Sequence, residues 1–405
     1  MKKYKLGELI EVSRGASLSG DYYASSGKYT RLTCGNFDYR NNCFKENTSK
    51  DNLFYTGEFK EKFLVEKGDL ITPLTEQAIG LLGSTAWIPE SGKYIQSQDI
   101  AKIICNEELI NKKFAYYLIS SNMVKQQLAS AAQQTKIRHT SPDKIKECVV
   151  WLPSLTKQKR IGQLLFDIDR KIKLNRAINH NLEAMAKQLY DYWFVQFDFP
   201  DENGRPYKSS RGKMVWNATL KRDIPEGWEV ANIRRVLDKV ITTPRVSTAE
   251  YLQAGSYPVI DQTTDVYCAG FTERQDAVVN QYPAVVFGDH SCAVKYVNFP
   301  FARGADGTQV ILSKEKNISI EYLYCFMKDV KIKKGYARHF GFLKEHPIIL
   351  PSETEAKKFQ GTVQILFEQI TRNRKENLSL TRLRDELLPL LMNGQVSVNY
   401  DLSHD

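Results

Sequence analysis

The clearest pattern of apolar and polar positions in this chain is a heptad repeat over residues 156–193. Apolar side chains, interrupted by asparagine, recur at alternating spacings of three and four, and charged residues flank them. One seam position is occupied by Leu165, Ile172, Asn179, Ala186 and Trp193, and the other by Ile161, Ile168, Asn175, Leu182 and Leu189. This spacing predicts a long helix that packs against another helix through a coiled-coil seam.

The same pattern returns 198 positions later, because residues 152–192 align with residues 350–390 without a gap. The Leu-Pro-Ser triplet at 152–154 recurs at 350–352. The second seam consists of Phe359, Val363, Leu366, Ile370, Asn373, Asn377, Leu380 and Leu387. Two positions depart from the first copy: Arg384 replaces Ala186, and Pro389 is expected to end the second helix early. A repeat of this length indicates two copies of one structural unit.

Both seams carry two asparagines close to their midpoints, namely Asn175 and Asn179 in the first and Asn373 and Asn377 in the second. Asparagine buried in an apolar seam lowers stability and fixes register and orientation. An antiparallel pair of helices would bring all four into one polar layer. A parallel pair would also match asparagine with asparagine, but a duplicated unit related by a two-fold axis favours the antiparallel arrangement. Exposed asparagines on two amphipathic helices are the alternative.

Each predicted helix follows a block of mixed character, residues 1–151 and 228–349. Strand-like runs occur at 63–72 and 100–105 in the first block and at 283–288 and 308–313 in the second. Helical stretches follow at 112–132 and 320–332, and a final strand leads into each Leu-Pro-Ser triplet. The blocks also begin alike, with YKLGELIEV from Tyr4 and WEVANIRRV from Trp228.

These elements predict an α+β fold with a pseudo-two-fold internal repeat, in which two α/β domains are separated by two long antiparallel coiled-coil helices. The expected segments are a first domain at 1–151, a first helix at 152–197, a connector at 198–227, a second domain at 228–349, a second helix at 350–395 and a tail at 396–405. The interiors of the two blocks diverge strongly, which favours two binders for two targets. Ordinary divergence after an old duplication is the alternative.

Composition adds a candidate partner. Lys and Arg number 57 against 47 acidic residues, so the net charge is +10, which suits a polyanion, with nucleic acid the leading candidate. Seven cysteines without a Cys-x-x-Cys pair and six dispersed histidines favour free thiols and give no support to a metal site. No apolar run is long enough to cross a membrane, so we expect a cytoplasmic protein without a membrane partner.

Motifs for catalysis are absent from the sequence. It has neither a Gly-x-x-x-x-Gly-Lys-[Ser/Thr] loop nor the Asn-Pro-Pro-[Phe/Tyr] motif of an amino-methyltransferase. Glu355-Ala356-Lys357 has the form of a nuclease motif but falls within the second heptad helix. Asp289-His290-Ser291 has the composition of a catalytic triad, yet sequence neighbours rarely form one, so we interpret it as a turn. We therefore expect no catalytic residue.

The order of these features resembles the DNA-specificity (S) subunit of type I restriction–modification systems. The resemblance covers nearly the whole chain and is most specific in LPS-x-x-x-QKRI from Leu152, in NRAINHNLEAMAKQLYDYWF from Asn175 and in LKRDIPEGWEV from Leu220. It implies that residues 1–151 and 228–349 are target-recognition domains, each of which reads one half of a split, asymmetric double-stranded DNA site. The antiparallel helices would set the gap between the two halves.

The resemblance also implies the partners. Two modification (M) subunits would carry S-adenosylmethionine and methylate adenine at N6, and two restriction (R) subunits would add translocation and cleavage. The chain itself would bind no cofactor. A scaffold, or a specificity module of another defence system that docks protein and not DNA, is the alternative function.

Candidate DNA contacts are basic and amide side chains in the blocks, because phosphates are bound by Lys and Arg and bases by Gln, Asn, Arg, Lys and His. The best stretch of the first block precedes its last strand and contains Gln133, Gln134, Lys136, Arg138 and His139. The corresponding stretch of the second block contains Lys333, Lys334, Tyr336, Arg338, His339 and Lys344. Further candidates are Arg14, Lys28, Arg31, Arg245, Lys295 and Arg303.

An aromatic cluster ends the first helix, with Trp193, Phe194, Phe197 and Phe199. We expect these rings to pack at a junction, either with a recognition domain or with a modification subunit. A role in the core of the chain itself is equally open.

Overall fold

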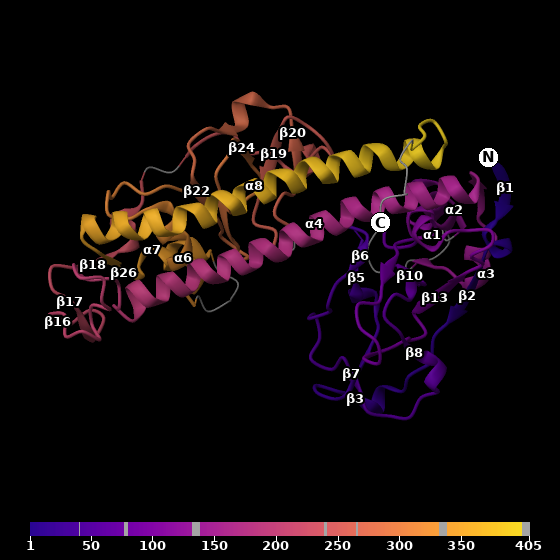
Figure 1. Ribbon diagram of the computed structural model, residues 1–405, viewed down its shortest axis with the longest axis horizontal. Helices are drawn as coiled ribbons and strands as arrows, with labels where there is room; N and C mark the ends of the chain where they lie inside the picture. The colour runs from indigo at the N-terminus through magenta and orange to yellow at the C-terminus, as the bar shows by residue number, and fades with distance from the viewer. Residues whose placement is uncertain are drawn as a thin grey trace. The chain divides into compact units, whose positions relative to one another are not determined.

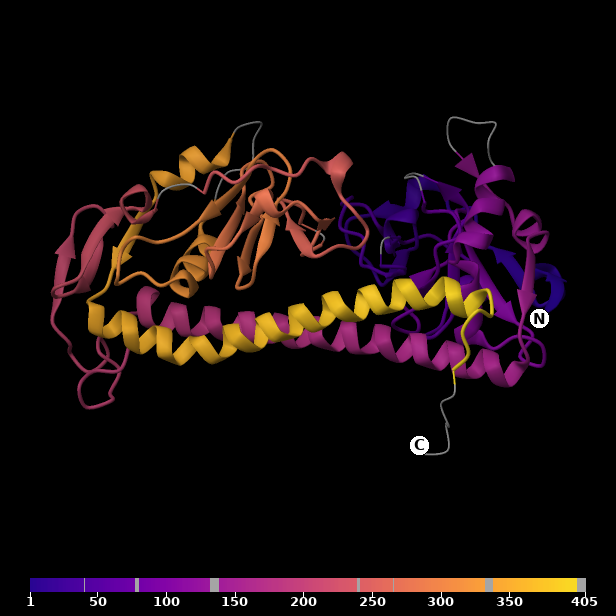
Figure 2. The same ribbon diagram turned by 90° about the horizontal axis from the view of Figure 1, so that it is seen from above.

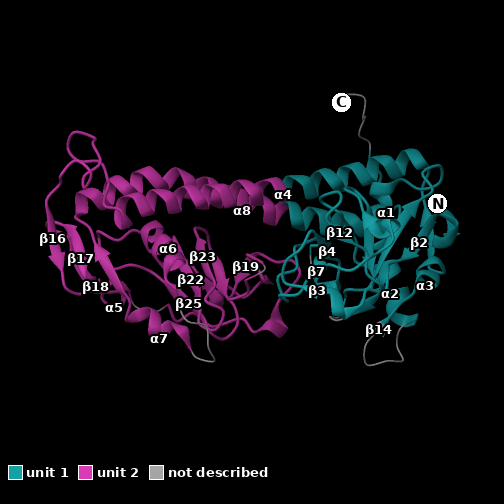
Figure 3. Ribbon diagram, turned by 90° about the horizontal axis from the view of Figure 1, so that it is seen from below, with its two compact units in different colours: residues 1–171, 380–405 teal, residues 172–379 magenta. Residues whose placement is uncertain are grey.

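The computed structural model describes residues 1–39, 41–76, 80–131, 138–238, 241–264, 266–331 and 338–398. The chain forms two compact units (Figure 3). Unit 1 consists of Met1–Lys171 and Leu380–Asp405, and unit 2 consists of Ile172–Ser379. The two long helices are α4 (Leu155–Tyr190) and α8 (Glu353–Met392) (Figure 1). Each contributes one segment to each unit (Figure 3).

Unit 1 contains an α/β domain followed by the first part of α4. Its strands are β1 (Lys2–Lys5), β2 (Ile10–Arg14), β3 (Tyr23–Ala24), β4 (Tyr29–Arg31), β5 (Phe37–Asp38), β6 (Cys43–Phe44), β7 (Phe54–Tyr55), β8 (Leu64–Val65), β9 (Leu70–Pro73), β10 (Thr75–Glu76), β11 (Ala86–Trp87), β12 (Tyr94–Ile95), β13 (Ile100–Cys105), β14 (Arg138–His139) and β15 (Val149–Leu152). Its shorter helices are α1 (Lys112–Ile119), α2 (Asn122–Ala131) and α3 (Pro142–Lys146).

The sheets of unit 1 are built around the strands that the sequence predicts. One has the order β11-β9-β13-β2 and another the order β3-β7-β4-β12-β8. Strand β13 occupies the predicted range 100–105, whereas the predicted run 63–72 contains β8 and all but the last residue of β9. The predicted helix over 112–132 is divided at Ser120 and Ser121 into α1 and α2. Phe114 and Leu118 of α1 are buried in the same core as Leu165 of α4, so the domain is anchored on the long helix.

Unit 2 contains the second α/β domain, the connector and the remaining helix segments. Its strands are β16 (Met214–Asn217), β17 (Arg222–Pro225), β18 (Glu229–Asn232), β19 (Tyr257–Ile260), β20 (Gly270–Thr272), β21 (Val278–Val279), β22 (Ala284–Gly288), β23 (Val294–Val297), β24 (Phe301–Arg303), β25 (Thr308–Ile311) and β26 (Pro347–Leu350). Its shorter helices are α5 (Ile233–Val236), α6 (Ile320–Asp329) and α7 (His339–Lys344).

The sheets of unit 2 have the orders β23-β22-β25 and β20-β19-β24-β21. Strands β22 and β25 and helix α6 lie in the runs that the sequence predicts as strands and helix. Strands β16 and β17 form an antiparallel hairpin within the connector. The central strand β22 is buried along its whole length, which agrees with its unbroken apolar sequence.

Both units close with the same two-stranded antiparallel sheet directly before a long helix. In unit 1, β1 pairs with β15 and Lys2 lies opposite Leu152. In unit 2, β18 pairs with β26 and Glu229 lies opposite Leu350. Because Leu152 and Leu350 are equivalent in the repeat, Lys2 corresponds to Glu229 and Met1 to Trp228. The sequence alignment of Tyr4 with Trp228 is therefore wrong by three residues.

Segments of α4 and α8 lie side by side and antiparallel in each unit (Figure 2). In unit 2, Asn175 contacts Asn377 and Asn179 contacts Asn373, so the numbers rise along one helix as they fall along the other. In unit 1, Asp169 contacts Arg384 in the same sense. The expectation that Pro389 ends the second helix early is wrong, because α8 continues to Met392. Pro389 lies in the last turn of α8, so its missing N–H affects only the end of the helix.

Candidate DNA-recognition surface

In both units the end of a central strand lies next to an Arg-His pair. In unit 1, β10 follows β9 and pairs with β14, with Thr75 opposite His139 and Glu76 opposite Arg138. His139 is exposed, and its Nδ1 lies 3.3 Å from Oγ1 of Thr75. Thr75 in turn donates a hydrogen bond of 3.2 Å to Oδ1 of Asp99. The exposed His139 imidazole is thus held at the tip of the sheet.

The corresponding contact in unit 2 is made by Asp289, which directly follows β22. Its backbone oxygen accepts a hydrogen bond of 2.9 Å from the amide of His339, and its Oδ1 accepts one of 2.7 Å from the amide of Phe340. Arg338 is exposed at the start of α7. The His339 side chain is instead 1% exposed, and its Nδ1 has no hydrogen-bond partner among the described residues. At this tip Arg338 faces solvent and His339 packs inward.

Several other candidates are exposed or half-buried and have few contacts. Arg14 donates from Nε to the carbonyl of Gln98 at 2.8 Å, which leaves the end of its guanidinium in solvent. The Lys28 ammonium lies 4.8 Å from the ring centroid of Tyr29. Arg245 forms an ion pair with the exposed Asp306. Lys344 is half-buried, with Nζ 4.5 Å from the centroid of Phe340. These positions could reach a phosphate without disturbing the fold.

Arg31 and Arg303 are buried, at 8% and 7% exposed. The Arg31 guanidinium lies 3.9 Å from the centroid of the Tyr23 ring and donates to the carbonyl of Asn52 at 3.3 Å. Arg303 donates to the carbonyls of Ile241 and Thr243 at 3.0 and 2.5 Å, and burial lowers its pKa. We assign both side chains to the folding of their own domains, because contact with DNA would require them to leave these partners.

Lys295 is also buried, at 7% exposed. Its ammonium donates to the carbonyls of Val266 and Tyr267 at 2.8 and 3.2 Å and lies 3.8 Å from Oδ1 of Asp261. Burial lowers its pKa to about 8, and Asp261 opposes this shift. A charge held inside the domain in this way is unsuited to a phosphate contact.

Part of the predicted surface lies outside the described residues. This applies to Gln133, Gln134 and Lys136 in unit 1 and to Lys333, Lys334 and Tyr336 in unit 2. The side chain of Arg138 is likewise not described. These residues stay predictions from the sequence.

His290 is a surface residue that the sequence pattern did not single out as a DNA contact. It lies in the turn after β22, which confirms the interpretation of Asp289-His290-Ser291 as a turn. Its amide donates to Oε1 of Gln262 at 3.1 Å, while Nε2 of Gln262 donates to the carbonyl of Asp306 at 2.8 Å. Gly307 has a positive φ of 81°, and a Cβ there would come within 2.8 Å of the imidazole. The exposed His290 ring therefore rests on a turn that other loops hold in place.

The four seam asparagines form one hydrogen-bonded layer in unit 2. Asn175 donates from Nδ2 to Oδ1 of Asn377 at 3.0 Å, and Asn373 donates to Oδ1 of Asn179 at 2.8 Å. The two acceptors donate onward to backbone carbonyls, Asn179 to Ile370 at 3.3 Å and Asn377 to Ile172 at 3.4 Å. Exchanging the two copies of the repeat maps each of these bonds onto another. The layer thus has the symmetry of the repeat itself.

The aromatic cluster at the end of α4 is part of the core of unit 2. Trp193, Phe194, Phe197 and Phe199 are each 1–4% exposed. The Phe194 ring lies 4.5 Å from Tyr322 of α6 and 4.8 Å from Phe359 of α8, as measured between ring centroids. The rings therefore pack against the second α/β domain. The expected packing against the second domain is therefore confirmed, and a contact with a modification subunit stays a prediction.

Three further observations concern membranes, metals and thiols. In the part of the chain that the structure describes, no helix is both long enough and apolar enough to span a membrane. Within the same ranges, no group of three or more His, Cys, Asp or Glu side chains is arranged to hold a metal ion. The seven cysteines, all of which lie in the described ranges, form no disulfide bond with one another.

The chain thus has two α/β domains, and each domain is followed by one copy of a repeated long helix. In each domain, polar residues lie at the end of a central strand. The type I restriction modification DNA specificity domain matches residues 1–184 and 225–381 of the chain. The chain belongs to this family, and the two matched segments correspond to the two copies of the repeat.

Two curated relatives show how far the likeness extends. The type I restriction enzyme MjaIX specificity subunit of Methanocaldococcus jannaschii is 24% identical, over 75% of this chain and 73% of its own length. The HindI specificity subunit of Haemophilus influenzae is 23% identical, over 75% of this chain and 81% of its own length. Specificity subunits are the non-catalytic components of restriction–modification complexes, so family membership supports the expectation that this chain is not an enzyme.

A solved structure supports the fold. The crystal structure of the type I restriction–modification S subunit from M. genitalium superposes with a TM-score of 0.55 at 16% sequence identity, over 96% of both chains. At this identity the likeness concerns the arrangement of the chain and not its residues.

Proposed function

We propose that this chain is the DNA-recognition subunit of a type I restriction–modification complex and reads an asymmetric, bipartite site. Each α/β domain reads one half of the site. Two modification subunits carrying S-adenosylmethionine methylate adenine where the chain places them, and two restriction subunits cleave. The chain contributes recognition and geometry, and no chemical step.

The observation that carries the proposal is a symmetric frame around dissimilar domains. The asparagine layer repeats its hydrogen bonds under exchange of the two copies, and both units close with the same two-stranded sheet. The remaining sheets differ: unit 1 has a five-stranded sheet where unit 2 has a four-stranded one. Two-fold symmetry in the frame suits two identical modification subunits, whereas unlike domains suit two different half-sites.

The helix pair has the properties of a spacer with a fixed register. A slip of one residue would remove four side-chain hydrogen bonds from the layer and place the asparagines against apolar neighbours. The register of α4 against α8 then fixes the separation between the two half-sites, as dimeric readers fix theirs through their own symmetry. Asn175, Asn179, Asn373 and Asn377 are the proposed register residues.

Two kinds of side chain are proposed to contact the DNA. Exposed cations, among them Arg14, Lys28 and Arg245, bind phosphates and set affinity. Polar side chains at the tips of the central strands read base edges, with His139 in unit 1 and His290 and Arg338 in unit 2. His139, His290 and Arg338 are exposed.

The test is a map of methylated adenines in cells that contain this chain and its modification subunit. In one variant residues 1–151 are replaced by the corresponding domain of a relative with a different site, and in a matched variant residues 228–349 are replaced instead. We expect each exchange to alter one half of a split motif, and the two exchanges to alter opposite halves. An unchanged motif, or a change in both halves from one exchange, would contradict the proposal. It would favour a scaffold that docks protein and not DNA.

A further inference from the structure

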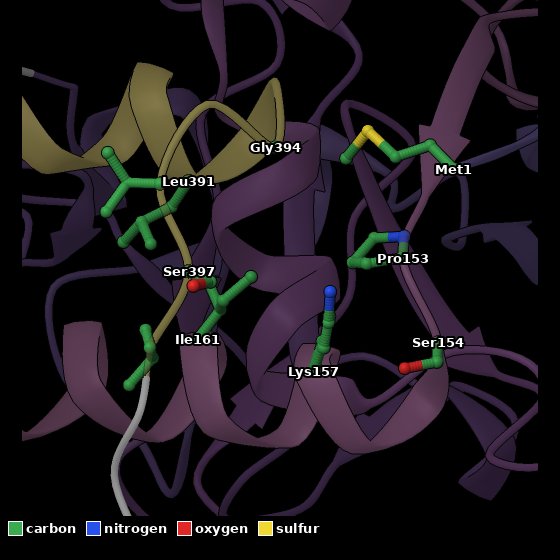
Figure 4. A pocket seen from close by; sticks show the side chains of 10 residues that line it. Met1, Pro153, Ser154, Lys157, Ile161, Leu391, Gly394 and Ser397 are labelled. Atoms are coloured by element: carbon green, nitrogen blue, oxygen red, sulfur yellow. The ribbon is translucent and has the colours of Figure 1, made fainter.

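A hollow of about 310 Å³ lies in unit 1 where the start of α4 meets the residues that follow α8 (Figure 4). This volume is at the lower end of the roughly 300–1,000 Å³ typical of ligand pockets. Most of its lining residues are apolar, and Lys157, Ser154 and Ser397 are the polar members. The lining residues are Met1, Pro153, Ser154, Lys157, Ile161, Leu391, Gly394, Val396, Ser397 and Val398.

The internal repeat identifies the equivalent place in unit 2. The register of the closing sheets makes Met1 equivalent to Trp228. The offset of 198 makes Ile161 equivalent to Phe359 and Leu391 equivalent to Trp193. Three apolar lining residues of the hollow thus have aromatic counterparts.

The segment after each long helix extends this comparison. Gln395-Val396-Ser397-Val398 follows α8 as Gln196-Phe197-Asp198-Phe199 follows α4, with one residue more in the spacing. Valine stands at both places where the connector has phenylalanine. In all, five aromatic positions of unit 2 are aliphatic in unit 1.

These replacements leave the space in unit 1 unfilled. In unit 2, the ring centroids of Phe199 and Trp228 are 4.9 Å apart and those of Trp193 and Phe359 are 5.6 Å apart. Trp228 is 8% exposed there, whereas Met1 is 54% exposed and Val396 is 41% exposed. Apolar surface around a concave site of this kind indicates a docking site.

We propose that the hollow binds an extended segment of a partner protein in which aromatic side chains alternate with an acidic residue. The segment that fills the equivalent place in unit 2 has this pattern, with Phe197 and Phe199 on either side of Asp198. Charge favours it as well, because Lys157 stands at the position of Glu355. Reversing a charge at the rim turns a site that repels a carboxylate into one that attracts it. The aromatic rings supply the buried area and the acidic residue meets Lys157.

The experiment titrates the full-length chain with a fluorescently labelled synthetic peptide WFVQFDFP, a copy of residues 193–200. We expect saturable binding of one peptide per chain, and binding at least ten-fold weaker for the peptide in which the copies of Phe197 and Phe199 are changed to alanine. Binding to the alanine peptide that equals binding to the parent, or the absence of saturable binding, would overturn the proposal.

Variants of the chain locate the peptide. Val396→Phe combined with Val398→Phe fills the hollow and should weaken binding at least ten-fold, while the melting temperature stays the same or rises. Lys157→Glu should weaken binding several-fold, with a smaller effect at high salt, whereas Lys173→Glu, an equal charge change on an exposed face of α4, should leave it unchanged. Equal effects of the two charge reversals, or full binding to the filled variant, would refute docking at this place.

A spectroscopic measurement covers the case in which the filled variant does not fold. With 13C-labelled methionine methyl groups, the peptide should shift Met1 and Met392, which lie at or beside the hollow, and leave Met214 and Met327 of unit 2 unchanged. A chain that ends at Val398 should bind the peptide with the same affinity. A gain of ten-fold or more on this truncation would assign the hollow to the chain's own residues 399–405 and overturn the partner. DNA affinity should not change in these variants, which separates this inference from the proposed function.

Discussion

Asn373 donates a hydrogen bond of 2.8 Å from Nδ2 to Oδ1 of Asn179 across the helix pair of unit 2. Both side chains are at least nine-tenths buried. Asn179 also donates from Nδ2 to the carbonyl of Ile370 on the opposite helix. Both side-chain NH2 groups of this pair therefore have a hydrogen-bond acceptor. A polar contact inside an apolar seam fixes one alignment of the two helices and lowers the stability of the pair.

The first prediction concerns this pair. Asn179→Ala should lower the free energy of unfolding by about 1–3 kcal/mol, because it leaves the buried Nδ2 of Asn373 without its acceptor. The combined change of Asn179→Leu and Asn373→Leu should be neutral or stabilising, because it removes both polar groups together. Urea unfolding followed by circular dichroism measures both. Asn181→Ala, at an exposed position of the same helix, is the control and should change stability by less than about 0.5 kcal/mol. A double variant less stable than Asn179→Ala would contradict the prediction.

The second prediction concerns the polar contact of unit 1. Arg384 donates to Oδ1 of Asp169 at 2.8 Å, and the hydroxyl of Tyr117 donates to Oδ2 at 2.6 Å. Arg384→Ala introduces the residue found at the equivalent position 186, yet it should cost about 3 kcal/mol because Asp169 loses its counter-charge in a largely buried place. Arg382→Ala, which breaks the exposed pair with Glu386, should cost about 0.5 kcal/mol or less. Chemical denaturation compares the two, and equal losses would show that burial does not matter here.

The sequence predicts both long helices and their pairing, because heptad spacing is a local pattern that can be read directly from the sequence. It also predicts strands within 100–105 and 308–313, because both runs are rich in β-branched and other apolar residues. The register of the closing sheets escaped it, because matching Tyr4 with Trp228 rests on side-chain likeness, whereas the true match of Met1 with Trp228 rests on backbone pairing. Local pattern and long-range pairing are different kinds of information.

The surface was harder to predict than the fold. Arg31, Lys295 and Arg303 have the charge of DNA contacts, but charge in a sequence does not reveal burial. Burial of these cations depends on contacts with residues that are distant in the sequence. One example is the carbonyl of Ile241, which accepts a hydrogen bond from Arg303. The sequence places His290 in a turn, and only the contacts with Gln262 and Gly307 show that the turn presents its ring. A residue that could read a base is recognised by the contacts that fix its side chain at the surface, and these contacts are known only from the structure.

A third prediction follows from the buried ammonium of Lys295, whose pKa burial lowers to about 8. In the unfolded chain a lysine titrates near about 10.4. Between these two pH values the unfolded state binds more protons than the folded state, so the free energy of unfolding should rise with pH over this range. Below pH 8 the fold carries the full penalty of the buried charge.

The measurement compares the chain with its Lys295→Met variant at several pH values between 7 and 10.5. The native chain should gain up to about 3 kcal/mol relative to the variant across this interval. Asp261, Cys268 and Arg374 face the ammonium and are present in both proteins, so the difference isolates Lys295. A difference that is constant with pH would contradict the lowered pKa.

A fourth prediction tests the role of the aromatic cluster. Trp193→Ala and Phe197→Ala each remove a ring that is at least 96% buried, so each should destabilise unit 2 by about 3–5 kcal/mol. Thermal unfolding measures the loss. Phe342→Ala, at a ring that is 61% exposed in α7, is the matched control and should have little effect. A Trp193 variant with unchanged stability that no longer binds its modification subunit would instead restore the interpretation of the cluster as a partner site.

The last prediction separates surface cations from buried ones through salt. Under the proposed function, Arg14→Ala and Lys28→Ala each remove one phosphate contact, so each should reduce the slope of log K against log salt for cognate DNA by about 1. Affinity should fall about equally for cognate and unrelated duplexes, because phosphates carry no sequence information.

Arg303→Met should leave the slope unchanged, since the guanidinium donates to Ile241 and Thr243 inside the domain, and its effect should appear as lower stability. Fluorescence anisotropy between about 50 and 200 mM salt measures the slopes. A reduced slope for a folded Arg303→Met protein would show that this buried arginine contacts phosphate. An unchanged slope for both surface variants would show that Arg14 and Lys28 do not.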